Sequence, residues 1–176
     1  MTTDSPIVRV GPRLSPDSRR VVARLFVPGE ELPGHHSRAT TVLQRVQDLS
    51  DSEVSAALAD LQTRFAARHR DIDDVFLQHF ELMAHRLGGE RLPRERRLLI
   101  GAYFTSEYAV EGAALTNPSM VSHPEQAGLG PGEQRFVMSA RAIGEGHISS
   151  IELRTGVVDA EGIVRIDDPG PYLDLG

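Results

Sequence analysis

The stretch RFVMSARAIGEGHISSIELRTGVVDAEG, residues 135–162, decides the fold class of this chain. Its first run alternates between apolar and polar side chains, and a Gly-Glu-Gly-His turn separates it from a second run. An Asp-Ala-Glu-Gly turn then leads to a third strand-like run. Alternation with a period of two residues indicates half-buried strands, and short glycine-containing turns between them indicate hairpins. We therefore predict a three-stranded antiparallel meander, with strands at Arg135 to Ile143, His147 to Thr155 and Gly162 to Ile166.

The residues before this meander have helical periodicity from Thr40 to Leu115. Ser50 and Glu53 have the spacing of a capping box at the start of a helix. Asp71 is predicted to begin the next helix, and Gly88-Gly89 to end it, since glycine is the usual residue beyond a helix C-terminus.

The third predicted helix, Glu95 to Leu115, is apolar on nearly every side, which is typical of a helix buried in the middle of its domain. Glu107 and Glu111 interrupt it four residues apart, so on a helix they share one face and repel each other. Burial makes that repulsion more costly. Two interpretations stay open. The carboxylates form ion pairs with arginines, such as the cluster Arg94, Arg96 and Arg97 or another arginine, or they project into a polar cavity and bind a ligand.

The expected fold class is α+β, in three segments. Residues 1–38 form an extended N-terminal arm with short strands, at Ile7 to Val10 and Val21 to Val27, between prolines. Residues 39–116 form the helical region and residues 117–176 the meander. Pro169 and Pro171 prevent the tail from continuing as a central strand, because proline cannot donate to the hydrogen-bond ladder.

The composition excludes several classes of protein. A net charge of -6 and a pI of about 5.6 argue against nucleic-acid binding, which needs clustered cations. Cysteine and lysine are absent, so thiol, disulfide and Schiff-base chemistry are excluded. The sequence has no apolar run that could span a bilayer and no signal-peptide pattern, so we expect a cytoplasmic protein. The pair His35-His36 lacks further ligands, and we expect neither a metal nor an organic cofactor.

The order of motifs around the meander resembles the first blade of glycoside hydrolase family 130. Asn117-Pro118 is followed by a strand that ends in Ser139-Ala140-Arg141-Ala142, by a glycine-containing turn, by Ile148-Ser149-Ser150-Ile151 and by a turn that closes in Glu161-Gly162. Enzymes of that family are five-bladed β-propellers that act on β-mannosides by phosphorolysis or hydrolysis, and the longer members place a helical segment before the propeller. The resemblance covers Leu98 to Gly162.

The resemblance implies roles for individual residues. Asn117 matches the asparagine that contacts the sugar in the central funnel, and Arg141 matches the arginine that hydrogen-bonds the substrate, a task suited to a planar fork of donors. Glu145 and His147 lie in the following turn, on the funnel side by analogy. With Glu107 and Glu111, these residues form our set of candidate substrate-binding residues. The alternatives are a solvated strand-end arginine at Arg141 and a plain turn initiator at Asn117.

The sequence departs from the family in one decisive respect. The family's general acid is an aspartate in a Glu-Asp-Pro-Arg type motif on a later blade, and no such motif occurs here. We therefore expect an incomplete propeller: the N-terminal part of a larger enzyme that binds an oligosaccharide, lacks a catalytic residue and is inactive in isolation. Inorganic phosphate is a co-substrate if the parent enzyme is a phosphorylase. The alternative is a non-catalytic helical interaction module with a small sheet, whose apolar face mediates self-association.

Overall fold

A computed structural model describes residues 12–29, 37–170 and 172–173 of the chain. Its described residues divide into two compact units. The sheet unit comprises residues 12–20 and 109–170, and the helical unit comprises residues 21–29, 37–108 and 172–173. Helices and antiparallel sheets are both present, so the α+β prediction is confirmed.

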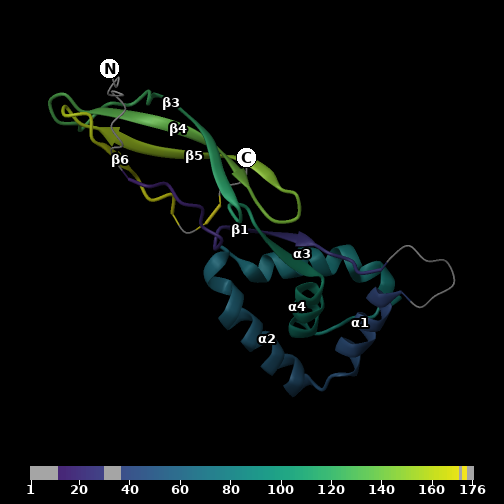
Figure 1. Ribbon diagram of the computed structural model, residues 1–176. Helices are drawn as coiled ribbons and strands as arrows, with labels where there is room; N and C mark the ends of the chain where they lie inside the picture. The colour runs from purple at the N-terminus through teal and green to yellow at the C-terminus, as the bar shows by residue number, and fades with distance from the viewer. Residues whose placement is uncertain (1–11, 30–36, 171, 174–176) are drawn as a thin grey trace. The chain divides into compact units, whose positions relative to one another are not determined.

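The helical unit is built around its last helix (Figure 1). Helix α4 (Arg94–Tyr103) contacts α1 (Arg38–Asp48), α2 (Asp51–Phe65) and α3 (Ile72–Met83). Two short 3-10 segments, η1 (Ala66–Arg68) and η2 (Ala84–Leu87), follow α2 and α3. The sequence predicts that the apolar helix beginning at Glu95 is buried. This helix is α4, and it is buried because helices on several sides cover it. The largest core cluster contains Ala39, Leu43, Val46, Val54, Phe80, Met83, Leu99, Ile100 and Phe104.

The predicted helix ends are confirmed where local side-chain chemistry sets them. Ser50 and Glu53 form the capping box, with Oε2 of Glu53 accepting from the Ser50 backbone N–H at 2.8 Å. The Asp71 side chain accepts from the backbone N–H of Asp74 at the start of α3. Gly88 takes a left-handed conformation at the end of η2, which residues other than glycine rarely adopt.

The prediction that the third helix runs to Leu115 is wrong. Helix α4 ends at Tyr103, and the next residues form strand β2 (Thr105–Ala109), which pairs with β1 (Val21–Leu25) in a two-stranded sheet. The Thr105 hydroxyl donates to the carbonyl of Gly101 at 2.8 Å, in the last turn of α4. β-Branched and aromatic residues in this segment favour a strand once a partner strand is available. Glu107 and Glu111 therefore do not share a helix face.

The sheet unit holds a four-stranded antiparallel sheet in the order β3-β4-β5-β6 (Figure 1). The predicted meander is confirmed as β4 (Gln134–Ile143), β5 (Ser149–Val158) and β6 (Val164–Ile166). Strand β3 (Ala114–Ser122), which contains Asn117-Pro118, adds a fourth strand to the three-stranded meander that the sequence predicts. Proline is tolerated there because β3 is an edge strand and its register shifts between Thr116 and Ser119.

The two faces of this sheet differ in burial. On β4 every second side chain is buried, namely Phe136, Met138, Ala140 and Ala142. The opposite face carries large apolar side chains that are about two-thirds exposed: Val121 at 65%, Ile151 at 66% and Leu153 at 64%. The sheet thus presents one packed face and one exposed apolar face.

The N-terminal arm of the prediction divides between the two units. The strand predicted at Val21 to Val27 is confirmed as β1, whereas Arg20 belongs to the sheet unit. The predicted strand at Ile7 to Val10 and the pair His35-His36 lie outside the described residues. Among the helices that the structure describes, none is long and apolar enough to cross a membrane.

Gly101 lets α3 and α4 approach closely, because a Cβ atom there would lie 1.8 Å from the backbone oxygen of Phe76. Backbone atoms of a packed helix cannot move aside cheaply, and overpacking typically costs about 1–3 kcal/mol. We expect Gly101→Ala to lower the free energy of unfolding by about 3 kcal/mol, measured by urea denaturation with circular dichroism at the helix band. In the control Gly130→Ala, the new Cβ atom meets only the flexible end of Glu133, and the expected change is below about 0.5 kcal/mol. Equal losses in both variants would contradict this account.

Candidate functional site

The structure places the six predicted site residues in three different environments. Four of them lie toward one end of the four-stranded sheet, which we call the sheet corner: Asn117, Arg141, Glu145 and His147. Glu111 is buried elsewhere in the sheet unit, and Glu107 belongs to the helical unit.

A β-bulge at Asn117 lies on the strand that neighbours Arg141. Thr116 is in register with Arg141, and the two residues of the bulge, Asn117 and Pro118, stand opposite Ala140. Asn117 has a φ of 51°, a left-handed conformation that asparagine adopts more readily than most residues. Both Asn117 and Arg141 are exposed, and they lie on the neighbouring strands β3 and β4.

Arg141 is anchored at one point and exposed elsewhere. Its Nε donates to Oγ of Ser149 on β5 at 2.9 Å. Guanidinium carries five N–H donors, and among the described residues no carboxylate forms an ion pair with Arg141. The remaining donors are therefore available to an external acceptor.

The turn between β4 and β5 is tied to the segment that leads into β3. Glu145 donates its backbone N–H to the carbonyl of Ala109 at 2.8 Å, and its Oε2 accepts the Ala109 N–H at 2.9 Å. Gly144 allows this approach, since a Cβ atom there would lie 2.3 Å from the same carbonyl oxygen. Glu145 thus positions the turn, while His147, with a φ of 59°, is exposed within it.

Glu111 belongs to a buried network of two carboxylates and two arginines. Arg20 lies with its Nε 2.9 Å from Glu111 and its Nη2 3.0 Å from Glu152. Arg154 contacts Glu111 through Nη2, and its Nη1 lies 3.1 Å from Glu152. The Nε–H of Arg20 makes no hydrogen bond, so its contact with Glu111 is an ion pair only. Glu111 is therefore compensated by arginines, although not by those of the predicted cluster.

This network, which we call the arginine–glutamate network, holds together parts of the sheet unit that are distant in sequence. The backbone N–H of Asp17 donates to Oε2 of Glu111 at 3.1 Å, and Nη1 of Arg20 donates to the carbonyl of Gly170 at 3.0 Å. Glu152 is in register with Ala140, the residue before Arg141. The network therefore lies on the packed face of the sheet, next to the strand position that carries Arg141 on the opposite face.

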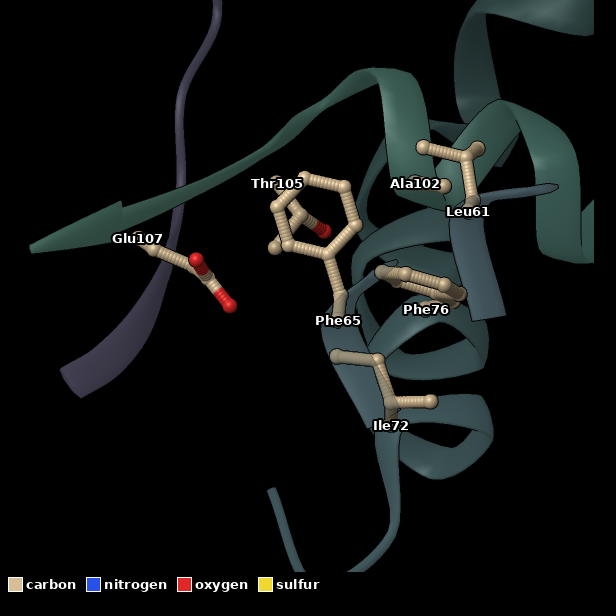
Figure 2. A pocket seen from close by; sticks show the side chains of 7 residues that line it. All are labelled: Leu61, Phe65, Ile72, Phe76, Ala102, Thr105 and Glu107. Carbon is tan, nitrogen blue, oxygen red and sulfur yellow. The ribbon is translucent and has the colours of Figure 1, made fainter. Parts of the chain in front are cut away.

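Glu107 lies in β2, where Arg68 compensates its charge and His69 helps to orient it. Its Oε2 accepts from Nη2 of Arg68 at 2.5 Å, and its Oε1 lies 2.6 Å from Nε2 of His69. Glu107 also lines a pocket of about 390 Å³ in the helical unit (Figure 2). The sequence left open whether this carboxylate pairs with an arginine or projects into a cavity. Glu107 does both.

Sequence reasoning missed the arginine partners, although β5 contains a signal for one of them, Arg154. Glu152 and Arg154 occupy the inward-facing positions of an alternating strand, between Ser150 and Gly156. Opposite charges at two successive inward positions indicate a buried ion pair rather than a solvated face. Nothing in the local pattern points to Arg20, whose contact with Glu152 spans 132 positions in sequence.

The described residues include no group of three or more histidine, aspartate or glutamate side chains arranged to hold a metal ion. Comparison of the chain with protein-family models, with curated proteins and with solved structures found no match.

We expect the arginine–glutamate network to make the stability of the sheet unit depend on pH in the acid range. Burial raises the pKa of Glu152, but hydrogen bonds and charges from Arg154 and Arg20 outweigh burial and leave this pKa below its usual value of 4.5. A carboxyl whose pKa is lower in the folded state stabilises the fold above pH 4.5, and this contribution is lost as the pH falls through the folded pKa. We expect Glu152→Gln to lower the free energy of unfolding at pH 7 by about 3–5 kcal/mol and to flatten its decline below pH 4.5. Urea denaturation between pH 3 and 7 measures both effects.

Glu125→Gln is the matched control, since Glu125 is exposed in the same unit. We expect its stability and its pH profile to match those of the unmodified chain within about 0.5 kcal/mol. A Glu152→Gln profile parallel to that of the unmodified chain would show that this carboxyl does not carry the acid sensitivity.

Proposed function

We propose that the sheet corner binds the mannosyl residue of a β-mannoside, as part of an enzyme of the glycoside hydrolase family 130 type. The observation that carries this proposal is the bulge at Asn117, which lies on β3 opposite Ala140, the residue before Arg141 on β4. Asn117 and Arg141 are the two residues to which the family resemblance assigns contacts with the sugar.

The chemistry of the sheet corner suits a neutral sugar. Arg141 offers a fork of N–H donors, and the Asn117 amide both donates and accepts, so together they can pair with neighbouring hydroxyl groups. Ile151, in register with Arg141 on β5, adds an exposed apolar surface for the C–H face of a pyranose ring. A hydroxyl-rich ring with one apolar face is complementary to this combination.

The proposed role of this chain is sugar binding and not bond cleavage. Glycoside hydrolysis requires two carboxyl groups on either side of the scissile bond. Glu107 and Glu111 are both engaged by arginines, and Glu145 holds the backbone of Ala109. A general acid for the reaction has to come from outside the sheet corner, and inorganic phosphate would be the second substrate if the parent enzyme is a phosphorylase.

The test is a titration of the full 176-residue chain with methyl β-mannoside, followed by backbone amide chemical shifts. We expect shifts at Arg141 and its strand neighbours, and weaker binding of methyl β-glucoside, which differs only in one hydroxyl configuration. Arg141→Ala should raise the Kd at least about tenfold, because a hydrogen bond from a charged donor contributes about 1.5–3 kcal/mol.

Arg135→Ala is the matched control, because Arg135 projects from the same strand and the same face at the other end of β4. Its Kd should stay within about twofold of the unmodified chain. Equal weakening by both variants, or no shift at the sheet corner at saturating sugar, would refute the proposal.

The exposed apolar face of the sheet supports a second candidate function, self-association. Val121, Ile151 and Leu153 lie on one face and are each about two-thirds exposed. Large apolar side chains grouped on one surface usually mark an interaction site. A second copy of this chain is the occupant that we propose for this face.

This candidate predicts a concentration-dependent mass in sedimentation velocity experiments. Leu153→Ser should shift the chain toward the monomer, raising the dimer dissociation constant at least about tenfold, because it removes apolar area from the centre of the face. Leu82→Ser, at an exposed leucine of the helical unit, should leave the mass distribution unchanged. A purely monomeric chain at all concentrations would exclude this second function.

A further inference from the structure

The helical unit contains a pocket of about 390 Å³ that none of the preceding functions uses. Its walls are apolar and come from α2, α3 and α4: Leu61, Phe65, Ile72, Phe76 and Ala102. Figure 2 shows the rings of Phe65 and Phe76 on one side and the Glu107 carboxylate opposite them. The volume lies within the range of pockets that hold small organic molecules.

The polar end of the pocket has one unused hydrogen-bonding position. A carboxylate has about four acceptor positions, two on each oxygen. Oε1 of Glu107 receives His69 Nε2 at 2.6 Å and Arg68 Nε at 3.3 Å, whereas Oε2 receives Arg68 Nη2 at 2.5 Å. One position therefore remains on Oε2, on a side chain that is 18% exposed.

Thr105, the other polar residue of the wall, has no donor to offer. Its hydroxyl hydrogen goes to the carbonyl of Gly101 at 2.8 Å, so its oxygen accepts from Nδ1 of His79 at 2.6 Å. Burial lowers the pKa of His79 below its usual value, which favours the neutral ring in this arrangement. The pocket lining thus offers acceptors only, and a ligand has to supply the donor.

The charge around Glu107 favours a neutral ligand. Arg68 compensates the carboxylate, so a cationic head group gains no net attraction there, and an anionic group would face the carboxylate itself. The same guanidinium stands over the Phe65 ring, 5.0 Å from its centre, and so orients a wall of the pocket. The acceptor and the aromatic wall are therefore held in place by one residue.

We propose that this pocket binds a small neutral aromatic molecule with one hydroxyl group. The ligand ring packs against Phe65 and Phe76, and its hydroxyl donates to Oε2 of Glu107. This proposal goes beyond the sugar site, which lies in the sheet unit, and it holds or fails independently of that site.

The test uses 4-methylphenol and toluene, which differ only in the hydroxyl group, with the full chain and amide chemical shifts as readout. We expect 4-methylphenol to shift amides of α2, α3 and β2 and to bind at least about tenfold more tightly than toluene, as expected for a hydrogen bond to a charged acceptor. Glu107→Gln should reduce that ratio to about threefold or less, because it replaces the charged acceptor by a neutral amide. Equal affinities for the two probes would overturn the proposal.

Two further variants separate filling of the pocket from general destabilisation. Ala102→Leu places extra side-chain atoms in the pocket and should weaken 4-methylphenol binding at least about tenfold. Ala56→Leu makes the same change on the exposed face of α2 and should leave the Kd within about twofold. If Ala102→Leu keeps full affinity, or if Ala56→Leu loses as much, the ligand binds elsewhere and the proposal is wrong.

Discussion

The sheet unit depends on the compensation of charge inside it. Glu111 and Glu152 are both almost fully buried, and each is neutralised by the same two arginines, Arg20 and Arg154. Removing two carboxylates from water is costly, and only well-placed cations offset the penalty. Since Arg20 comes from the N-terminal segment and Arg154 from β5, the network can form only when the strands and that segment are assembled together. The packed face of the sheet is thus specified by charge as well as by apolar contact.

Local chemistry determined what could be predicted from the sequence. Ser50 with Glu53, and Asp71, mark helix starts because their side chains bond to backbone groups a few residues away. The alternation in β4 revealed the meander for a similar reason, since one face of the sheet is packed. The errors arose where distant partners decide the outcome. Thr105–Ala109 follows directly on a helical pattern, but its pairing with β1 makes it a strand.

The candidate sugar site stays a prediction, because it rests on the order of motifs. The bulge at Asn117, on the strand next to Arg141, has no clear sequence signal beyond an Asn-Pro pair. The partners of Glu107 could not be predicted, because a helical assignment turned the carboxylate toward Glu111 instead of toward Arg68 and His69. Because residues 105–109 were assigned to a helix, the sequence did not indicate the pocket that Glu107 lines. Correct placement of β2 would have separated the two glutamates into different units.

The pair Asn117-Pro118 also affects the chemical stability of the chain, because it determines whether Asn117 can deamidate. Asparagine side chains deamidate when the backbone nitrogen of the next residue attacks the amide carbon and closes a five-membered succinimide. The nitrogen of Pro118 carries no hydrogen and is already part of a ring, so this cyclisation is blocked. An exposed asparagine in a left-handed bulge would otherwise be at risk of conversion to aspartate or isoaspartate. The proline that interrupts the ladder of β3 therefore also preserves a neutral amide on the strand next to Arg141 over the lifetime of the protein.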